Sequence, residues 1–228
     1  MISGASRGIG RAIAEQLLED GYQLSLGVRM PENFEPLLPS GAGGQVQIQA
    51  YDASDPSSAS RWVQTCRDRF GGVDGLIHCA GIFSRVGLLF DDGQEQEIED
   101  LWTVNVMGPW WLTRAAWPDL VSSGDARVIT LVSMSGKRVK GNLAGYAASK
   151  FALMALCQSM RNIGWAEGIR VTAICPSWVN TDMANSVQVI SKEEMTQPQD
   201  LAKIASLLLQ LPSASVPFEL CVNCRLES

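Results

Sequence analysis

The sequence predicts an α/β fold in which helices cover both faces of a doubly wound parallel sheet. Short apolar runs rich in β-branched residues alternate with longer segments of helical period along all 228 residues. A glycine-rich turn at residues 3–10 leads directly into a helical segment, as the crossover between parallel strands requires. No stretch has the length of an interdomain linker, so we expect a single domain over residues 1–228.

Each expected strand is short and bounded by Gly, Asp, Ser or Pro. The strands are expected at residues 22–28, 45–51, 73–79, 127–133, 169–175 and 217–223, and the helices at 9–20, 56–70, 95–121, 146–166 and 198–210. Only Met1 and Ile2 precede the glycine-rich turn, whereas a strand usually has ~5–6 residues. The first strand is therefore stunted, or residues are missing upstream. The irregular stretch 177–197 predicts a short lid before the last helix, at the carboxyl edge of the sheet.

Composition and charge exclude several classes of protein. Apolar residues make up 46% and charged residues 18% of the chain, as in ordinary globular proteins. A net charge of −6 without a Lys/Arg cluster argues against nucleic-acid binding. No apolar run approaches the ~18 residues that span a bilayer, and no signal peptide is recognisable. We expect a cytoplasmic protein with neither nucleic-acid nor membrane partners.

The cysteines and the single histidine do not predict a metal site. Most of the six cysteines lie in apolar runs, so we expect reduced core residues. Cys221 and Cys224 have the C-x-x-C spacing of redox and zinc sites, but residues three apart on a strand point to opposite faces. His78 ends an apolar run, where a packed strand residue is expected. We expect no bound metal.

The glycine-rich turn is a candidate phosphate-binding loop. Glycines permit a tight turn and close backbone approach, and the following helix presents N–H groups and the positive end of its dipole to a pyrophosphate. The G-x-x-x-G-x-G spacing also occurs in turns without a ligand. The candidate cofactor-binding residues here are Gly4, Ser6, Arg7, Gly8, Ile9 and Gly10.

The next expected strand bears on the choice of cofactor. The run from Leu24 to Arg29 ends without the carboxylate that would bind the ribose 2′-hydroxyl of NAD. An arginine at this place suits a 2′-phosphate. Arg29, helped by Arg7, therefore predicts NADP(H), although either arginine could be a solvated surface charge.

Tyr146 and Lys150 form a candidate acid–base pair. They lie four residues apart at the start of an expected helix, so their side chains share a face. A phenol has an ordinary pKa near ~10, and an adjacent ammonium lowers it. Such a tyrosine passes a proton to or from a carbonyl oxygen. At this spacing a solvated surface pair is the alternative.

Together these motifs resemble the single-domain short-chain dehydrogenase/reductase family across nearly the whole chain. The ordered set comprises the glycine loop, Cys79-Ala80-Gly81, Asn105, Ser133, Tyr146-x-x-x-Lys150 and Pro176-Ser177-Trp178-Val179-Asn180-Thr181. The resemblance implies a Rossmann-like fold and an NADP(H)-dependent oxidoreductase that interconverts a carbonyl and a secondary alcohol on a small organic substrate.

The resemblance also assigns catalytic roles. Tyr146 is the proton donor and acceptor, and Lys150 tunes it and contacts the nicotinamide ribose. Ser133 orients the substrate oxygen, with Ser135 as a rival by position. Asn105 holds a water molecule in a proton relay.

Further cofactor contacts follow from the same resemblance. Asp52 and Ala53 line the adenine pocket, Ala80 and Gly81 approach the ribose, and Val179 and Thr181, in the segment that starts at Pro176, hold the carboxamide. Asp52 could instead be only a loop residue, and Thr181 only a helix N-cap.

Two departures from the family pattern stand out. His78 and Cys79 replace two asparagines, which puts local rigidity in doubt, and Ser177 replaces a glycine, which leaves a side chain close to the nicotinamide.

The expected substrate pocket is mainly apolar. Its candidate walls are Phe83, Met134, Leu143 and Trp178. Arg85, Arg138 and Lys140 could reach an anionic group or could be solvated. The sequence does not name the substrate.

Two other functions stay open. A 3-oxoacyl-carrier-protein-reductase-like enzyme would need a basic patch for its acidic carrier, and residues 118–125 and 162–167 offer none. A non-catalytic dinucleotide-binding regulatory protein would not need all four candidate catalytic residues.

Aromatic residues on two expected helices predict self-association. After the sheet-facing stripe is filled, the outer faces of helices 95–121 and 146–166 still carry Trp110, Trp111, Trp117, Met160 and Trp165. So much apolar surface predicts a homodimer or homotetramer.

Overall fold

The computed structural model describes residues 1–34 and 44–225, and its described strands join one parallel sheet. The order is β3-β2-β1-β4-β5-β6-β7, with the direction of winding reversed between β1 and β4. The strands are β1 (Ile2–Ser3), β2 (Leu24–Val28), β3 (Val46–Ala50), β4 (Gly75–His78), β5 (Arg127–Leu131), β6 (Arg170–Pro176) and β7 (Glu219–Val222). The predicted doubly wound α/β fold is confirmed.

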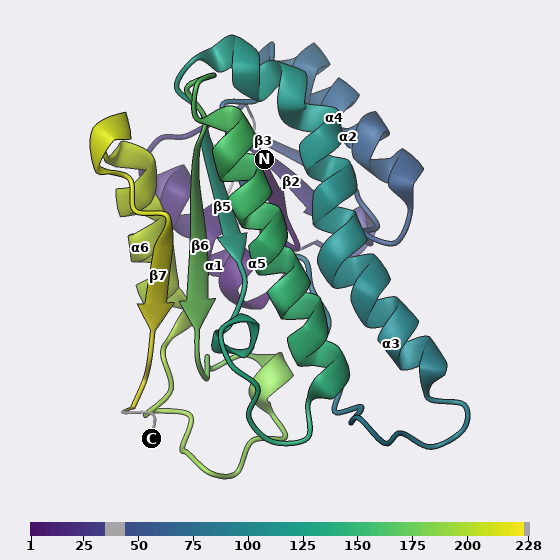
Figure 1. Cartoon of the computed structure of the whole chain (residues 1–228). Helices are drawn as coiled ribbons and strands as arrows, with labels where there is room; N and C mark the ends of the chain where they lie inside the picture. The colour runs from purple at the N-terminus through teal and green to yellow at the C-terminus, as the bar shows by residue number, and fades with distance from the viewer. Residues whose placement is uncertain (35–43, 226–228) are drawn as a thin grey trace.

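Helices pack on both faces of the sheet (Figure 1). One face is covered by α2 (Pro56–Phe70), α4 (Gly108–Ser123) and α5 (Ala144–Gly164), and the other by α1 (Gly8–Glu19) and α6 (Pro198–Gln210). The helix α3 (Glu95–Trp102) precedes α4. None of the described helices is long and apolar enough to cross a membrane.

Local sequence signals account for the ends of these helices. Asp55 caps α2, because its side chain accepts a hydrogen bond from the Ser57 N–H at 2.8 Å, and Gly71 ends the helix with a φ of 85°. Gln197 and Asp200 form a capping box at the start of α6. These caps set where each helix meets its neighbouring loops.

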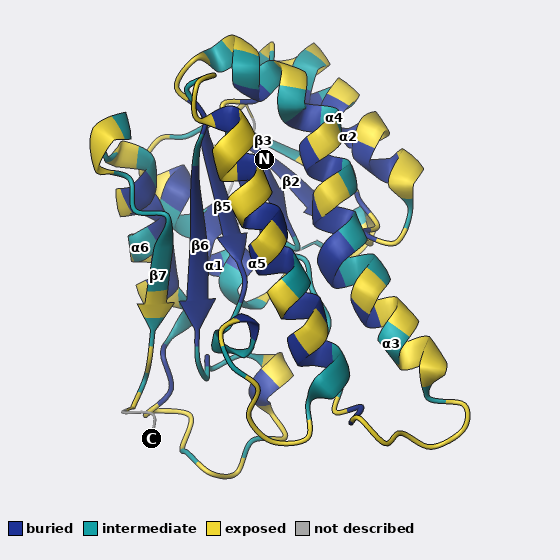
Figure 2. Cartoon of the chain, in the orientation of Figure 1, coloured by how far each residue is buried: buried dark blue, intermediate teal, exposed yellow. Residues whose placement is uncertain are grey.

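The central strands of the sheet are buried (Figure 2). All five residues of β2 and of β5 are buried. The Trp62 ring lies over Gly27, where a Cβ would approach the ring to 2.5 Å, and the Trp62 indole N–H donates to Ser25 Oγ at 2.8 Å. Gly27 is therefore required by the close approach of α2 to the sheet.

The expected continuous helix over 95–121 is wrong. A π-helical turn, Thr103–Met107, separates α3 from α4. Pro109 has no N–H to donate to the carbonyl of Asn105 four residues earlier, so the regular ladder cannot continue there. The turn places Asn105 in the interior, with no exposed surface.

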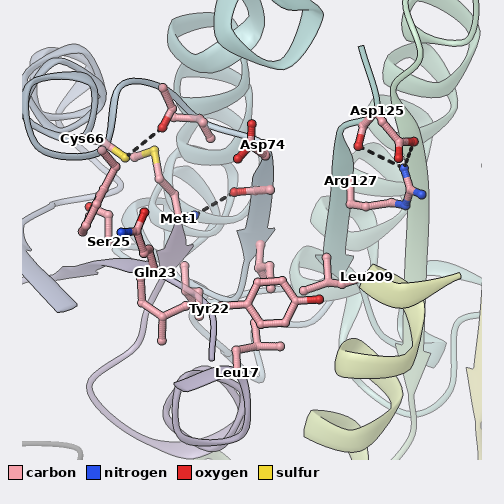
Figure 3. A pocket seen from close by; sticks show the side chains of 17 residues that line it. Met1, Leu17, Tyr22, Gln23, Ser25, Cys66, Asp74, Asp125, Arg127 and Leu209 are labelled. Carbon is pink, nitrogen blue, oxygen red and sulfur yellow. Dashed lines mark hydrogen bonds and ion pairs between the residues drawn. The ribbon is translucent and has the colours of Figure 1, made fainter. Parts of the chain in front are cut away.

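A pocket lies at the amino edge of the sheet, opposite the loops that follow the strands (Figure 3). Ile2 pairs with Leu26 and Ile77, whereas β2 and β4 begin two residues earlier, at Leu24 and Gly75. The two-residue β1 thus starts later than both of its neighbours at this edge, which leaves space between them. Side chains lining the pocket include Tyr22, Cys66, Asp74 and Arg127.

Candidate active site

The glycine loop lies between β1 and α1, at the carboxyl edge of the sheet where the winding reverses. Gly4 has a φ of 68°, and a Cβ on it would lie 2.7 Å from the Ala80 backbone nitrogen. A Cβ on Gly10 would lie 2.4 Å from the Gly4 carbonyl oxygen. Only glycine fits either position, so the loop forms a close backbone cradle.

This cradle fits the diphosphate of a dinucleotide. Arg7 occupies the N-cap of α1 but makes no side-chain cap, and the first turn carries no acidic residue. The positive end of the helix is therefore available to an anion. Ligands of open α/β sheets bind at this edge, at the point where the winding reverses.

Ser3 joins the cradle to the end of β4. Its hydroxyl oxygen accepts hydrogen bonds from the Cys79 and Ala80 N–H groups, each at 3.2 Å. Gly8 approaches the next candidate segment, because a Cβ on it would lie 3.3 Å from Thr181 Cγ2. The structure thus brings Ala80 and Thr181 close to the glycine loop.

The residues expected to determine cofactor preference also lie at the carboxyl edge of the sheet. Arg29 is exposed directly after β2, and Asp52 is exposed after β3. Asp52 accepts hydrogen bonds from the N–H and hydroxyl of Ser54, at 2.9 and 2.7 Å. Ala53 is buried against Gly108, and the guanidinium of Arg7 donates to Asp182 at 3.1 Å.

Candidate catalytic side chains gather at the carboxyl edge of the sheet, around the loop that follows β4. Tyr146 and Lys150, in the first turns of α5, are buried, and Lys150 Nζ lies 5.7 Å from the centre of the Tyr146 ring. A Cβ on Gly81 would lie 3.2 Å from Asn105 Oδ1 and 3.8 Å from Lys150 Nζ. Asn105 and Lys150 therefore both lie close to Gly81, on the loop that follows β4.

Burial controls the acid–base properties of the pair. It raises the pKa of Tyr146 to about 12, against a hydrogen bond with Ser133 that lowers it. It also lowers the pKa of Lys150 to about 8. The Lys150 ammonium donates to the Leu131 carbonyl at 3.1 Å. The expectation that Lys150 lowers the pKa of Tyr146 is wrong for this arrangement, in which the phenol is neutral and holds its proton at physiological pH.

Ser133 has a strained backbone. Its φ of 143° and ψ of 156° lie in a region that is nearly restricted to glycine, at a cost of about 1–3 kcal/mol. Its hydroxyl accepts from the Ser135 N–H at 3.1 Å and hydrogen-bonds with Tyr146. Of the two rival serines, Ser133 is the one that contacts the tyrosine.

Asn105 fastens the loop after β4 to α5. Its amide bonds both backbone groups of Ile82, at 2.9 and 3.0 Å, and donates to Ser149 Oγ at 3.1 Å. Ser149 in turn donates to the Tyr146 carbonyl at 2.7 Å. Sequence reasoning missed Ser149, although a serine three residues after the tyrosine, on the buried stripe of the helix, was a signal for it.

The candidate wall residues of the substrate pocket differ in their contacts and burial. The Phe83 ring meets the Tyr146 ring edge to face, with centres 5.0 Å apart. Met134 directly follows Ser133 and packs against the core. Leu143 occupies the N-cap of α5, and Trp178 follows β6; both are half-buried. Phe83 is thus the wall residue that contacts the candidate acid.

Ser177 does not point as the sequence predicts. Its hydroxyl accepts from the Cys224 N–H at 3.1 Å and lies 3.3 Å from Cys224 Sγ. The side chain is therefore engaged by the segment after β7 rather than left beside the nicotinamide position. Val179 is buried and bridges to Thr196, and Pro176 is the buried last residue of β6.

The six cysteines are free thiols, but the expectation that they are core residues is wrong for one of them. Cys221 is exposed on β7, whereas the others are buried or half-buried. Within the described part of the chain no group of three or more His, Cys, Asp or Glu side chains is arranged to hold a metal ion.

His78 is a packed strand residue, as expected. It is buried, its Nε2 lies 3.0 Å from Thr113 Oγ1, and its Nδ1 has no partner among the described residues. Burial lowers the pKa of His78 to about 3 from 6.5. The imidazole is therefore neutral in the folded chain at physiological pH.

This depressed pKa predicts an acid-sensitive stability. Between pH 6.5 and about 3 the unfolded chain binds a proton at His78 that the folded chain does not, so stability falls as the pH falls. The loss should approach the order of 1 kcal/mol per pH unit. Urea unfolding of wild type and His78→Asn checks it: the difference between the two should shift in favour of the variant below pH 6.5. A constant difference would contradict the prediction.

Comparisons with known proteins agree with this fold and site. A family model described as short chain dehydrogenase matches residues 1–190. An agropine synthesis reductase from Rhizobium rhizogenes is 36% identical over 231 residues, covering 100% of this chain and 53% of that protein. The chain spans about half the length of the agropine synthesis reductases that it matches. Oxidoreductase UcpA from Escherichia coli K12 is 32% identical over 201 residues, covering 85% of this chain and 74% of that protein.

Solved structures share the whole architecture. An alcohol dehydrogenase from Thermococcus sibiricus, complexed with 5-hydroxy-NADP, has a TM-score of 0.87 and 29% identity, covering 97% of this chain and 94% of that one. A 3-ketoacyl-(acyl-carrier-protein) reductase from Brucella melitensis, complexed with NADH, has a TM-score of 0.86 and 22% identity, covering 98% and 95%. At that identity the second likeness shows the fold alone.

The fold and the site define a doubly wound α/β protein with a glycine cradle and a tyrosine–lysine pair at the carboxyl edge of its sheet. The chain belongs to the short-chain dehydrogenase/reductase family.

Proposed function

We propose that this protein is an NADP(H)-dependent oxidoreductase that interconverts a carbonyl and a secondary alcohol on a small organic substrate. The observation that carries the proposal is the buried Tyr146, which hydrogen-bonds with Ser133 and lies beside Lys150 next to the glycine cradle. In this proposal residues 1–228 form one cofactor-binding and catalytic domain. The reduced thiols are in keeping with a cytoplasmic location.

In the proposed reaction the cofactor, when bound, supplies or accepts the hydride. Tyr146 holds a proton at its hydroxyl at neutral pH and donates it to the carbonyl oxygen. Ser133 orients the same oxygen from its fixed, strained position. Lys150 would contact the nicotinamide ribose, and Asn105 keeps the loop that carries Ala80 and Gly81 against α5.

A coupled assay of NADPH oxidation tests this function. The purified chain would be screened against ketones, aldehydes and oxo acids, and we expect substrate-dependent oxidation of NADPH with at least one class. Binding of NADPH without turnover of any carbonyl compound, and without oxidation of any alcohol with NADP, would instead support a regulatory dinucleotide-binding protein.

The proposed preference for NADP(H) depends on Arg29. No carboxylate follows β2 at this position, Arg29 is exposed there, and the Thermococcus sibiricus relative is complexed with 5-hydroxy-NADP. We expect NADPH to bind more tightly than NADH, and Arg29→Asp to reduce or reverse the preference, because a carboxylate repels the 2′-phosphate and accepts from a 2′-hydroxyl. Fluorescence titration with both cofactors measures it, and equal affinities in the wild type would refute it.

A carrier-linked substrate is the second candidate. The likeness to the Brucella melitensis carrier-protein reductase concerns the fold alone, and the chain has a net charge of −6. An acidic carrier would be repelled unless a basic patch lay beside the site. A free small-molecule substrate is therefore proposed first.

We also propose that the chain forms a homodimer or homotetramer through α3, α4 and α5. The expected patch needs correction, because Met160 is buried and Trp111 and Trp117 are half-buried against the core. Exposed apolar side chains remain on these helices: Trp102, Trp110, Phe151, Ile163 and Trp165. Sedimentation at micromolar concentration should show a species larger than the 24.7 kDa chain. A monomer alone would exclude the assembly.

A further inference from the structure

Arg85 lies one aromatic ring away from the candidate catalytic tyrosine. Its guanidinium carbon is 5.7 Å from the centre of the Phe83 ring, and that ring lies 5.0 Å from the Tyr146 ring. The three side chains therefore form a continuous row from a cation to the proposed proton donor. A group bound by Arg85 would sit a short carbon chain away from the reacting carbonyl.

The backbone around Arg85 is held firmly against α5. Ser84 hydrogen-bonds with the carboxylate of Glu97, and its hydroxyl accepts from the Val86 N–H at 3.1 Å. Val86 is buried, and its carbonyl accepts from the N–H of Gly145, the residue before Tyr146, at 3.3 Å. Both neighbours of Arg85 are thus anchored, which fixes where its side chain begins relative to Tyr146.

The charge of Arg85 is not neutralised by the protein. Among the described residues no carboxylate pairs with it, and its polar contact is a hydrogen bond from Nη2 to the Ser186 hydroxyl at 3.2 Å. Glu97, which bonds with the neighbouring Ser84, and Asp182, four residues before Ser186, have other partners, because Asp182 pairs with Arg7. Ser186 belongs to the stretch between β6 and α6, so Arg85 already bridges the two segments that flank the site.

We propose that Arg85 binds a carboxylate of the substrate, and that the substrate is an oxo acid whose carbonyl and carboxylate are separated by a short apolar chain. The guanidinium would donate two parallel hydrogen bonds to the carboxylate, with the Ser186 hydroxyl as a further donor. The Phe83 ring would pack along the connecting chain. A single cation with one hydroxyl suits a monoanionic carboxylate better than a phosphate dianion. This inference rests on the proposed function of the site.

The test compares charged and neutral forms of the same ketones. Acetoacetate, levulinate and their longer homologues would be assayed with NADPH, each beside its methyl ester. We expect one chain length to give the highest kcat/KM and its acid to be preferred over its ester. Arg85→Gln should lower kcat/KM for that acid ~10- to 100-fold, chiefly through KM, and change the ester less than about twofold. Arg85→Lys should keep part of the preference.

Arg69→Gln is the matched control, because it removes the same charge from an exposed position at the end of α2, near the amino edge of the sheet. It should leave the preference for acid over ester unchanged. Equal use of acids and esters by the wild type, or equal losses for both in Arg85→Gln, would overturn the inference. Reduction of neutral ketones only would overturn it while leaving the proposed function intact. No turnover of any carbonyl compound would defeat both.

Discussion

Replacing Tyr146 by phenylalanine should abolish turnover and leave NADPH binding nearly unchanged. The substitution removes the hydroxyl that holds the proton and keeps the ring that packs against Phe83. General acid–base groups contribute ~10²–10⁴-fold, so the loss of kcat should fall in that range or beyond. Steady-state kinetics with a working substrate and a cofactor titration give the two measurements.

Phe83→Leu is the control for packing, because it disturbs the same aromatic contact and keeps the phenol. It should alter KM more than kcat. A Tyr146→Phe enzyme with near-normal turnover would overturn the mechanism while leaving the fold and the family membership as they are.

The substitution Lys150→Met should weaken both cofactor binding and turnover. The ammonium lies within van der Waals reach of a Cβ at Gly81, on the loop that approaches the proposed ribose position. Its removal takes away a charge that is proposed to serve both cofactor binding and proton transfer. We therefore expect kcat/KM to fall ~10²-fold or more.

Unfolding measurements separate this loss from a structural defect. Burial lowers the pKa of Lys150 from 10.5 to about 8, so between these values the unfolded chain binds more protons at this residue than the folded chain. Its contribution to stability therefore rises with pH across this window. The stability of the wild type relative to Lys150→Met should increase from pH 8 to 10.5. A difference independent of pH would show that the ammonium is not buried as described.

Much of the fold could be predicted from the sequence, because strand and helix periods are local properties. All six expected strands and the two-residue β1 are present, and the cofactor loop lies where the glycines indicate. The π-helical turn was not predicted. It arises because Pro109 has no N–H to donate to the Asn105 carbonyl, while the surrounding helical pattern is regular.

The errors at the site arise from contacts between elements distant in sequence. Met160 was expected on an outer face, but it packs against Thr113 of α4, and a helical pattern does not show which apolar stripe meets a neighbouring helix. The pKa of Tyr146 is raised by burial and lowered by a hydrogen bond with Ser133, which precedes α5, and a helical pattern shows neither effect. Ser177 likewise bonds to Cys224, 47 residues away.

The pairing of Arg7 with Asp182, 175 residues apart, has a consequence for how the chain folds. The glycine loop lies near residue 4, yet its neighbours Ala80 and Thr181 reach it only when β4 and β6 have joined the sheet that contains β1. Contacts of such long sequence separation form slowly. A partly folded chain therefore lacks the glycine cradle, and a dinucleotide that binds there would stabilise only the assembled sheet.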